Sequence, residues 1–140
     1  MESFNGDSFV VDCNVIVKCF ILEEEASSEA VNLLEKASRN EVILYAPGLI
    51  IVEFLNVLTK YNRLKTFETK ESKKYFSVFL EDIEKKIINI YSLRNERNDV
   101  LDLALLEKIS YFDAEYLYLS KKLKFELITY DKGLKKIANR

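Results

Sequence analysis

The stretch that decides the fold is Ser8-Phe9-Val10-Val11-Asp12-Cys13-Asn14. Residues 8–11 are a short run, mostly apolar and ending in two β-branched valines, that follows Gly6-Asp7, and this pattern is typical of a fully buried strand. Asp12 then places an ionised side chain at the end of an apolar run, which is costly unless a positive partner meets it. Proteins usually accept that cost where a metal ion or a reaction needs the charge. Asp12 is therefore the first candidate site residue.

The rest of the chain alternates strands with helices. We predict further strands at about 42–45, 87–90 and 126–129. The predicted helices lie at about 15–22, 28–39, 49–61, 69–85, 99–109, 111–123 and 132–138. Strands separated by helices pair in parallel and are covered on both faces, so we expect a three-layer α/β/α fold with a central parallel sheet of four or five strands. A length of 140 residues suits a single domain spanning residues 1–140.

Several local features of the helices are also predicted. Ser27 or Ser28 is expected to cap the helix that ends near residue 39, and Pro47 is expected in the first turn of the next helix. The helix at 99–109 is expected to bury Leu101, Ala104, Leu105 and Ile109. In the helix at 69–85, a core face is predicted for Tyr75, Phe76 and Phe79, with a dimer face as the alternative.

Composition excludes several kinds of chemistry. The sequence has no histidine, which removes Ser-His and Cys-His nucleophilic catalysis, histidine acid–base pairs and the usual zinc sites. Cys13 and Cys19 have apolar neighbours and are predicted to be small core residues. The net charge of −2 does not suit a broadly basic nucleic-acid surface, although it allows a nuclease with an acidic, metal-neutralised pocket. Hydrolysis would then depend on carboxylates and a hard metal ion.

The sequence also bears on location. Its apolar stretches are broken by Asp12, Lys18, Pro47 and Glu53, so none is long enough to cross a bilayer. Residues 1–7 lack the basic and then apolar pattern of a signal peptide. We therefore expect a cytoplasmic protein with no membrane partner.

Three further acids join Asp12 as candidates: Glu53, Asp113 and Asp131. Glu53 has only apolar residues on either side at 50–52 and 54–55, with a buried salt bridge as the alternative role. Asp113, Asp131 and Asp12 could instead serve as helix caps. In parallel sheets, sites form outside the carboxyl ends of the strands. All four acids can face that edge and bind one divalent metal.

Polar neighbours extend this candidate site. Asn14 lies two residues after Asp12, and Thr129 points to the same side of the chain as Asp131, because side chains of a strand alternate. Asn56 is expected to help orient the Glu53 carboxylate from three residues along the same helix. Glu115 and Asp102 rank below the four acids.

Four motifs, in order, resemble those of the PIN-domain family and, within it, the VapC-like toxin ribonucleases. Val10-Val11-Asp12-Cys13-Asn14-Val15 is similar to the family's opening strand with its D-x-[SN] signature. The stretch from Pro47 to Leu58 is similar to its P…E-x-x-N-V-L helix. Tyr111-Phe112-Asp113-Ala114 and Thr129-Tyr130-Asp131-Lys132 are similar to its Y-x-D-A and T-x-D elements.

The resemblance implies a Mg²⁺- or Mn²⁺-dependent endonuclease for single-stranded RNA. The catalytic and metal-binding acids that it implies are Asp12, Glu53, Asp113 and Asp131, and the implied supporting residues are Asn14 and Thr129. It also implies a homodimer and a small protein antitoxin that blocks the site. The chain departs from the family pattern at Glu115, where an apolar residue is common, and it ends soon after the last helix, so a fifth strand is in doubt.

Two other functions are weighed against this one. A non-catalytic PIN-like module would bind RNA or a protein without cutting. A phosphorylatable receiver domain would need a carboxylate after the third strand, where this chain has Ile90-Tyr91-Ser92. Metal-activated water attacking phosphorus should leave 5′-phosphate and 3′-hydroxyl ends.

Overall fold

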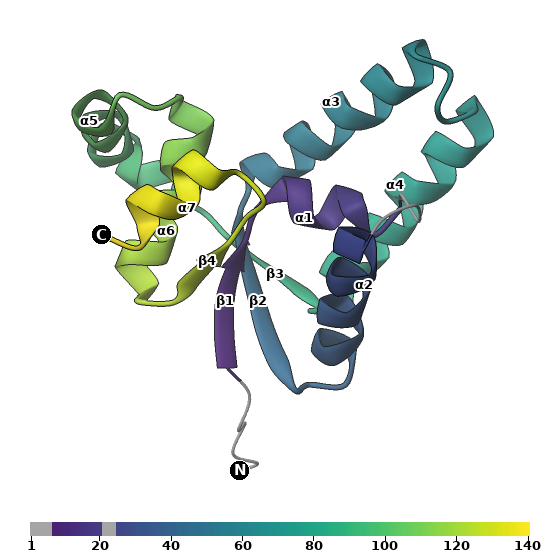
Figure 1. The fold of residues 1–140 in the computed structure, drawn as a ribbon, viewed down its shortest axis with the longest axis horizontal. Coiled ribbons are helices and arrows are strands. Elements are labelled where there is room, and N and C mark those ends of the chain that lie inside the picture. Colours follow the sequence, from purple (N-terminus) through teal and green to yellow (C-terminus); the bar gives the residue numbers. More distant parts are fainter. Residues whose placement is uncertain (1–6, 21–24) are drawn as a thin grey trace.

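The computed structural model describes residues 7–20 and 25–140, except for the side chains of residues 25–27. Four strands form one parallel sheet in the order β3-β2-β1-β4 (Figure 1). Their bounds are β1 (Asp7–Val11), β2 (Val42–Pro47), β3 (Ile88–Tyr91) and β4 (Glu126–Ile128). The predicted parallel α/β fold is confirmed, and the sheet has four strands in the described part of the chain.

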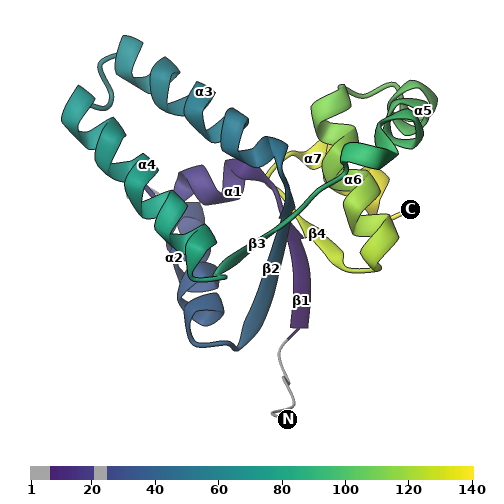
Figure 2. The same ribbon diagram turned by 180° about the vertical axis from the view of Figure 1, so that it is seen from behind.

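Helices cover both faces of the sheet, as the two opposite views show (Figures 1 and 2). One layer contains α1 (Cys13–Lys18), α2 (Glu25–Ser38), α3 (Leu49–Arg63) and α4 (Thr69–Glu84). The other layer contains α5 (Arg97–Glu107), α6 (Tyr111–Leu123) and α7 (Lys132–Ala138). A short 3₁₀ turn, η1 (Arg94–Glu96), leads from β3 into α5. None of the helices in the described residues is long and apolar enough to span a bilayer.

The core lies on both sides of the sheet. Val10 and Val11 of β1 and Leu44 of β2 are fully buried, which fits strands covered on both faces. The α1–α4 side is filled by aromatic rings, including Phe54 stacked on Phe79 with centroids 4.3 Å apart. α6 packs against β1, β2 and β4 and is buried along most of its length.

The strand order creates a crevice at one edge of the sheet. After β3 the chain crosses to the far side of β1, so β1 and β4 are neighbours although they stand at opposite ends of the sequence. The helix after β1 belongs to one layer and the helix after β4 to the other (Figure 1). Such a switch point leaves a crevice outside the carboxyl ends of the strands, where ligands bind in open α/β sheets.

Three local predictions are wrong. Pro47 is the last residue of β2, not part of a helical turn; it pairs only with Tyr91, because the pairing of β2 with β1 has already ended at Tyr45. A proline, which has no N–H, is tolerated at such a strand end. Ser27 and Ser28 lie inside α2, which begins at Glu25, rather than capping it. The first helix begins two residues earlier than expected and ends at Lys18, and residues 21 and 22 of the prediction lie outside the described residues.

The prediction for the face of α5 is also partly wrong. α5 packs on α6 through buried Val100 and Ala104, whereas Leu101 and Leu105 point outward. The helix is apolar on most sides, so residue spacing alone did not decide which side is buried. By contrast, the core interpretation of Tyr75 and Phe79 is confirmed: Phe79 is fully buried, and the Tyr75 ring lies 4.8 Å from that of Phe20.

Candidate active site

Asp12 and Thr129 meet where β1 and β4 end. The register pairs Val11 with Ile128, so the next residue of each strand is brought alongside the other. Thr129 Oγ1 donates a 2.7 Å hydrogen bond to Oδ2 of Asp12, and both residues are buried. Asp12 stands at the N-cap position of α1, but its side chain makes no capping hydrogen bond. Its carboxylate nevertheless interacts with the backbone N–H groups of Cys13 and Asn14, which lower its pKa, so a role at the helix start coexists with a place at the crevice.

Asn14 connects the first turn of α1 to the loop after β4. Its Nδ2 lies 3.4 Å from Oγ1 of Thr129, and its Oδ1 accepts a 3.2 Å hydrogen bond from the backbone N–H of Tyr130. The backbone N–H of Asp131 donates to Thr129 Oγ1 at 3.0 Å. Asn14 and Thr129 thus hold the two strand ends in a fixed relation, in keeping with the supporting position expected for them.

Glu53 reaches the same region from the second turn of α3. Its Oε1 accepts a 2.6 Å hydrogen bond from the hydroxyl of Tyr116 on α6. Among the described residues, no cation lies within ion-pair distance of Glu53, so the salt-bridge alternative is not what the structure contains. Asn56 lines the same cavity as Glu53, but Tyr116, not Asn56, orients the carboxylate.

Tyr116 was not predicted from the sequence to be part of the candidate site. It is fully buried and three residues after Asp113, a spacing that puts both side chains on one face of α6. That i, i+3 relation to a candidate acid was the available signal. A buried tyrosine hydroxyl needs a hydrogen-bond acceptor, and here the acceptor is the candidate acid Glu53.

Asp113 and Asp131 also take part in hydrogen bonds at the N-termini of α6 and α7. The backbone N–H of Asp113 donates to the Ser110 side chain at 3.0 Å, as expected for the start of α6. Asp131 caps α7, because its Oδ1 accepts a 3.0 Å hydrogen bond from the backbone N–H of Leu134. The capping role predicted for Asp131 is thus real, and it coexists with a place at the crevice.

All four candidate acids line one cavity of about 380 Å³. The other lining residues are Cys13, Asn14, Asn56, Val57 and Phe112. The β1–α1 junction, α3, α6 and the β4–α7 loop therefore each contribute one carboxylate, although the acids span residues 12 to 131 of the chain. We call this hollow the acidic cavity.

Electrostatics within the acidic cavity favour neutral or cation-bound carboxyl groups. Burial raises the pKa of Asp12 to about 6; the Thr129 hydrogen bond opposes this shift, and the charge of Asp113 adds to it. Burial also raises the pKa of Glu53 to about 7, with the Tyr116 hydrogen bond opposing and Asp12 adding to the shift. The pKa of Asp113 is raised by burial and then by Asp131. Burial likewise raises the pKa of the Cys13 thiol, in line with a core cysteine.

The donor set fits a hard divalent cation. No three acidic or cysteine side chains, among those described, converge closely enough to form a ready-made cage. Mg²⁺, however, is usually held by one or two carboxylates while it keeps several waters. Oxygen donors with raised pKa values around a 380 Å³ cavity suit that mode of binding, because a cation would relieve the repulsion between them.

Glu115 lies just outside the acidic cavity. It is 9% exposed and close enough to Glu53 to raise the pKa of that residue. The pKa of Glu115 itself is raised by burial, with Tyr111 and then Arg97 opposing the shift. The Tyr111 hydroxyl is buried beside Glu115, and its interaction with that carboxylate also contributes to a raised pKa of Tyr111. Glu115 lines a neighbouring hollow instead of the acidic cavity.

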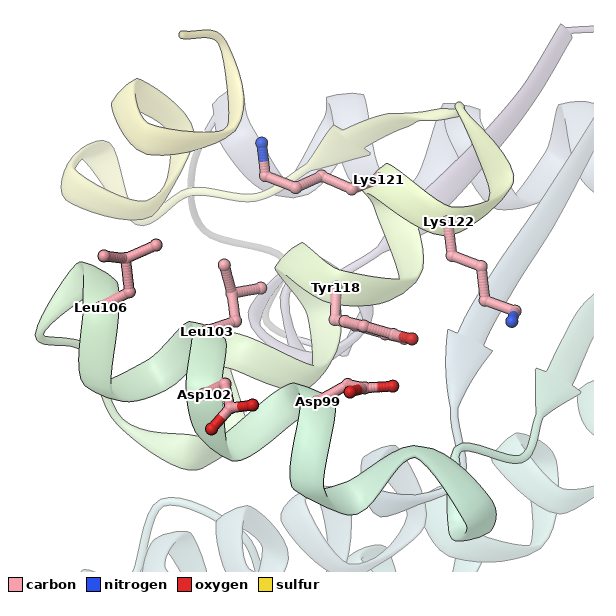
Figure 3. A pocket seen from close by; sticks show the side chains of 7 residues that line it. All are labelled: Asp99, Asp102, Leu103, Leu106, Tyr118, Lys121 and Lys122. Carbon is pink, nitrogen blue, oxygen red and sulfur yellow. The ribbon is translucent and has the colours of Figure 1, made fainter.

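Asp102 is remote from the four acids. It lines a separate hollow of about 510 Å³ between α5 and α6. Figure 3 shows Asp99 and Asp102 on α5, and Lys121 and Lys122 on α6, around an apolar wall that includes Leu103 and Tyr118. The matched opposite charges make this hollow close to neutral, unlike the acidic cavity. Its composition supports ranking Asp102 below the four acids.

The fold and the acidic cavity agree with comparisons to known proteins. The model of the PIN domain matches residues 9–140, and the chain therefore belongs to the PIN domain family. It is similar to the crystal structure of PAE2754 from Pyrobaculum aerophilum, with a TM-score of 0.68 and 16% identity over 94% of this chain and 85% of that one. At this identity the likeness shows the fold alone. A search of curated protein sequences found no match.

Family membership gives the class of activity. PIN domains are generally nucleases, which indicates phosphodiester hydrolysis, and they typically use divalent metals. Asp12, Glu53, Asp113 and Asp131 are the candidate carboxylates for such chemistry, because they are the acids that line the acidic cavity.

Proposed function

We propose that the protein is a Mg²⁺- or Mn²⁺-dependent endoribonuclease that cleaves single-stranded RNA. The observation that carries the proposal is the convergence of Asp12, Glu53, Asp113 and Asp131 on one cavity at the switch point of the sheet. The absence of histidine supports it, since carboxylates and a metal are then the remaining means of hydrolysis.

The carboxylates at the cavity would hold the cation, with Asp12 and Glu53 the most firmly positioned among them. Thr129 fixes Asp12, and Tyr116 fixes Glu53, so neither side chain must be ordered when a ligand binds. Asp113 extends from α6 and Asp131 from the start of α7, opposite Glu53 on α3. When bound, Mg²⁺ or Mn²⁺ would neutralise the cavity and lower the pKa of an attacking water.

The residues explain why the site needs a cation before it can accept RNA. A phosphodiester is anionic, and ionised carboxylates at Asp12, Glu53 and Asp113 would repel it. The pKa values of these three carboxyl groups are raised by burial and by repulsion from neighbouring carboxylates, so each group ionises less readily. Asn14 and Thr129 would keep the two strand ends in place while charge enters the cavity.

The test is cleavage of an end-labelled single-stranded RNA in Mn²⁺, in Mg²⁺ and in EDTA. Wild type should cut only with metal and leave 5′-phosphate and 3′-hydroxyl ends. Asp12→Asn should reduce the rate by at least about 100-fold, whereas Asp102→Asn, a matched change outside the cavity, should leave it unchanged. Equal cutting by Asp12→Asn and wild type, or cyclic-phosphate products, would contradict the mechanism. RNA binding without cutting by wild type would favour the non-catalytic module.

We further propose that the nuclease is a VapC-like toxin that acts in the cytoplasm, blocked by a small protein antitoxin. Its four sequence motifs and its membership of the PIN family support this proposal. Expression of wild type in bacteria should arrest growth, and expression of Asp113→Asn should not. Equal growth of the two strains would contradict the toxin role. The nuclease activity is tested separately by the cleavage assay.

We also propose a homodimer. The support in the structure is an exposed apolar strip on α5, where Leu105 is 68% and Leu106 is 76% exposed. The Tyr75–Phe79 side of α4 is not a candidate for this contact, since it packs within the α1–α4 layer.

A further inference from the structure

A second hollow lies beside the acidic cavity, and α3 and α6 contribute residues to both. It measures about 460 Å³ and is lined by residues of the β2–α3 junction, the end of β3, the turn into α5, and α6. On α3, Leu49 and Val52 line this hollow, whereas Glu53 and Asn56 line the acidic cavity. These positions have the i, i+3, i+4, i+7 spacing of one helix face, so the two hollows follow one another along the same face of α3.

The charges of the two hollows are opposite. Arg94 and Arg97 line the second hollow together with a single carboxylate, that of Glu115. Both arginines are exposed, and neither forms an ion pair with a described side chain. Glu115 is almost buried and lies close enough to both Arg97 and Glu53 to interact electrostatically with each. Two guanidinium groups against one carboxylate leave a surplus of positive charge directly beside the acidic cavity.

Apolar side chains complete the hollow. Val52 is 54% exposed and Ile90 is 37% exposed, and both line it. Exposed apolar side chains next to guanidinium groups suit a ligand that carries both an anionic group and a planar apolar group. A nucleotide is such a ligand: guanidinium groups bind phosphate in a bidentate manner, and bases pack on apolar side chains or on arginine planes. A volume of about 460 Å³ lies within the range of small-ligand pockets.

We propose that Arg94 and Arg97 bind the phosphate of a nucleotide next to the cleaved bond of single-stranded RNA, with its base against Val52 and Ile90. This inference rests on the proposed function, because it gives that function its substrate-binding subsite. The subsite explains how a chain of net charge −2 holds a polyanion: the positive charge is local and lies about one turn of α3 away from the acids. Arg94 and Arg97 are positioning residues for the strand, and the acids remain the catalytic ones.

The test is equilibrium binding of a fluorescent single-stranded RNA 12-mer, followed by anisotropy in the Asp12→Asn background so that no cleavage intervenes. Adding Arg94→Ala and Arg97→Ala should weaken binding by at least about tenfold and reduce the salt slope by about one. Adding Arg39→Ala, which removes an arginine at the opposite edge of the sheet, should change the affinity by less than about twofold. Replacing both Arg94 and Arg97 by lysine should restore part of the affinity, since the charge returns without the bidentate fork.

Kinetics in the otherwise wild-type protein give a second readout. The Arg94→Ala/Arg97→Ala variant should raise KM and leave kcat near wild type, as expected for lost uniform binding. Both arginines are exposed, so circular dichroism and the melting temperature should stay close to wild type.

The outcomes separate this inference from the proposed function. Equal affinity and equal salt slope with and without the two arginines would overturn the subsite, even if wild type cleaves RNA. Arginine-dependent binding by a wild type that never cleaves RNA would support the subsite and overturn the nuclease. A protein that neither binds nor cleaves single-stranded RNA would overturn both.

Discussion

The hydroxyl of Tyr116 on α6 donates a 2.6 Å hydrogen bond to Oε1 of Glu53 on α3, joining side chains 63 residues apart in sequence. The bond links the two helical layers across the acidic cavity. It also opposes the rise in the pKa of Glu53 that burial causes. Orientation and charge of one candidate catalytic acid therefore depend on a residue that belongs to no motif.

Replacing Tyr116 by phenylalanine should raise the pKa of Glu53 above about 7 and leave its carboxylate free to rotate. We expect cleavage at pH 7 to fall about tenfold, in keeping with the loss of a hydrogen bond to a charged group. The acid limb of the pH–rate profile should also move to higher pH. The matched control is Tyr118→Phe, whose hydroxyl donates to Glu96 outside the cavity. An unchanged profile in Tyr116→Phe would show that the bond does not tune Glu53.

Thr129 is expected to be sensitive to isosteric change. Its Oγ1 donates to Asp12 and accepts from the backbone N–H of Asp131 and from Asn14 Nδ2, so Thr129→Val removes the partner of all three groups. We expect a loss of about 1–3 kcal/mol in the free energy of unfolding, measured in urea, and at least about a tenfold loss of cleavage. Thr129→Ser keeps the hydroxyl and should retain most of the activity. If Thr129→Val keeps wild-type stability and activity, the hydrogen bonds of the hydroxyl do not matter.

The metal-free protein should lose stability as pH rises. Burial raises the folded-state pKa values of Asp12 to about 6 and of Glu53 to about 7, above their ordinary values of 3.8 and 4.5. The folded state then binds protons more tightly than the unfolded state, so the free energy of unfolding falls between about pH 4 and pH 7. For Asp12 alone the effect is at most about 3 kcal/mol. Urea unfolding in EDTA at pH 5 and pH 8 measures it, and higher stability at pH 8 would refute the assignment.

Asp12→Asn should lower the cleavage rate and raise the stability of the metal-free protein. Without metal at pH 8, the neutral amide removes a buried charge that other acids repel, so we expect the variant to be more stable than wild type by about 1–3 kcal/mol. Wild type should gain about 2.7 kcal/mol from Mn²⁺ at 100 times its Kd, and Asp12→Asn should gain much less. Thermal melts with increasing Mn²⁺ give both numbers. A full Mn²⁺ response in Asp12→Asn would remove Asp12 from the set of ligands.

The homodimer should depend on α5. Replacing Leu105 and Leu106 by lysine places charges in the exposed apolar strip, and light scattering after gel filtration should then report the mass of a monomer. The control is Leu64→Lys at the far end of α3, an equally exposed leucine outside that strip, which should leave the wild-type mass unchanged. A wild type that is monomeric at high concentration would exclude the dimer.

The sequence by itself determined the order of strands and helices and therefore the parallel α/β fold. It also pointed to Asp12 and Asp131, because each directly follows a strand, and the carboxyl ends of parallel strands share one edge. The sequence also predicted the cap at Ser110 and the strand at Glu126–Ile128, because both depend only on residues close together in the chain.

Tertiary structure alone decided which side chains meet. The hydrogen bond from Tyr116 to Glu53 and the hollow around Arg94 and Arg97 join elements far apart in the chain, and no local pattern records such contacts. The exposure of Leu101 and Leu105 was decided in the same way, because an apolar helix buries whichever side its neighbour covers, here Val100 and Ala104 against α6. The propensity to form a helix or a strand depends on residues close together in the sequence. The shape and charge of a cavity arise only when separate elements pack together.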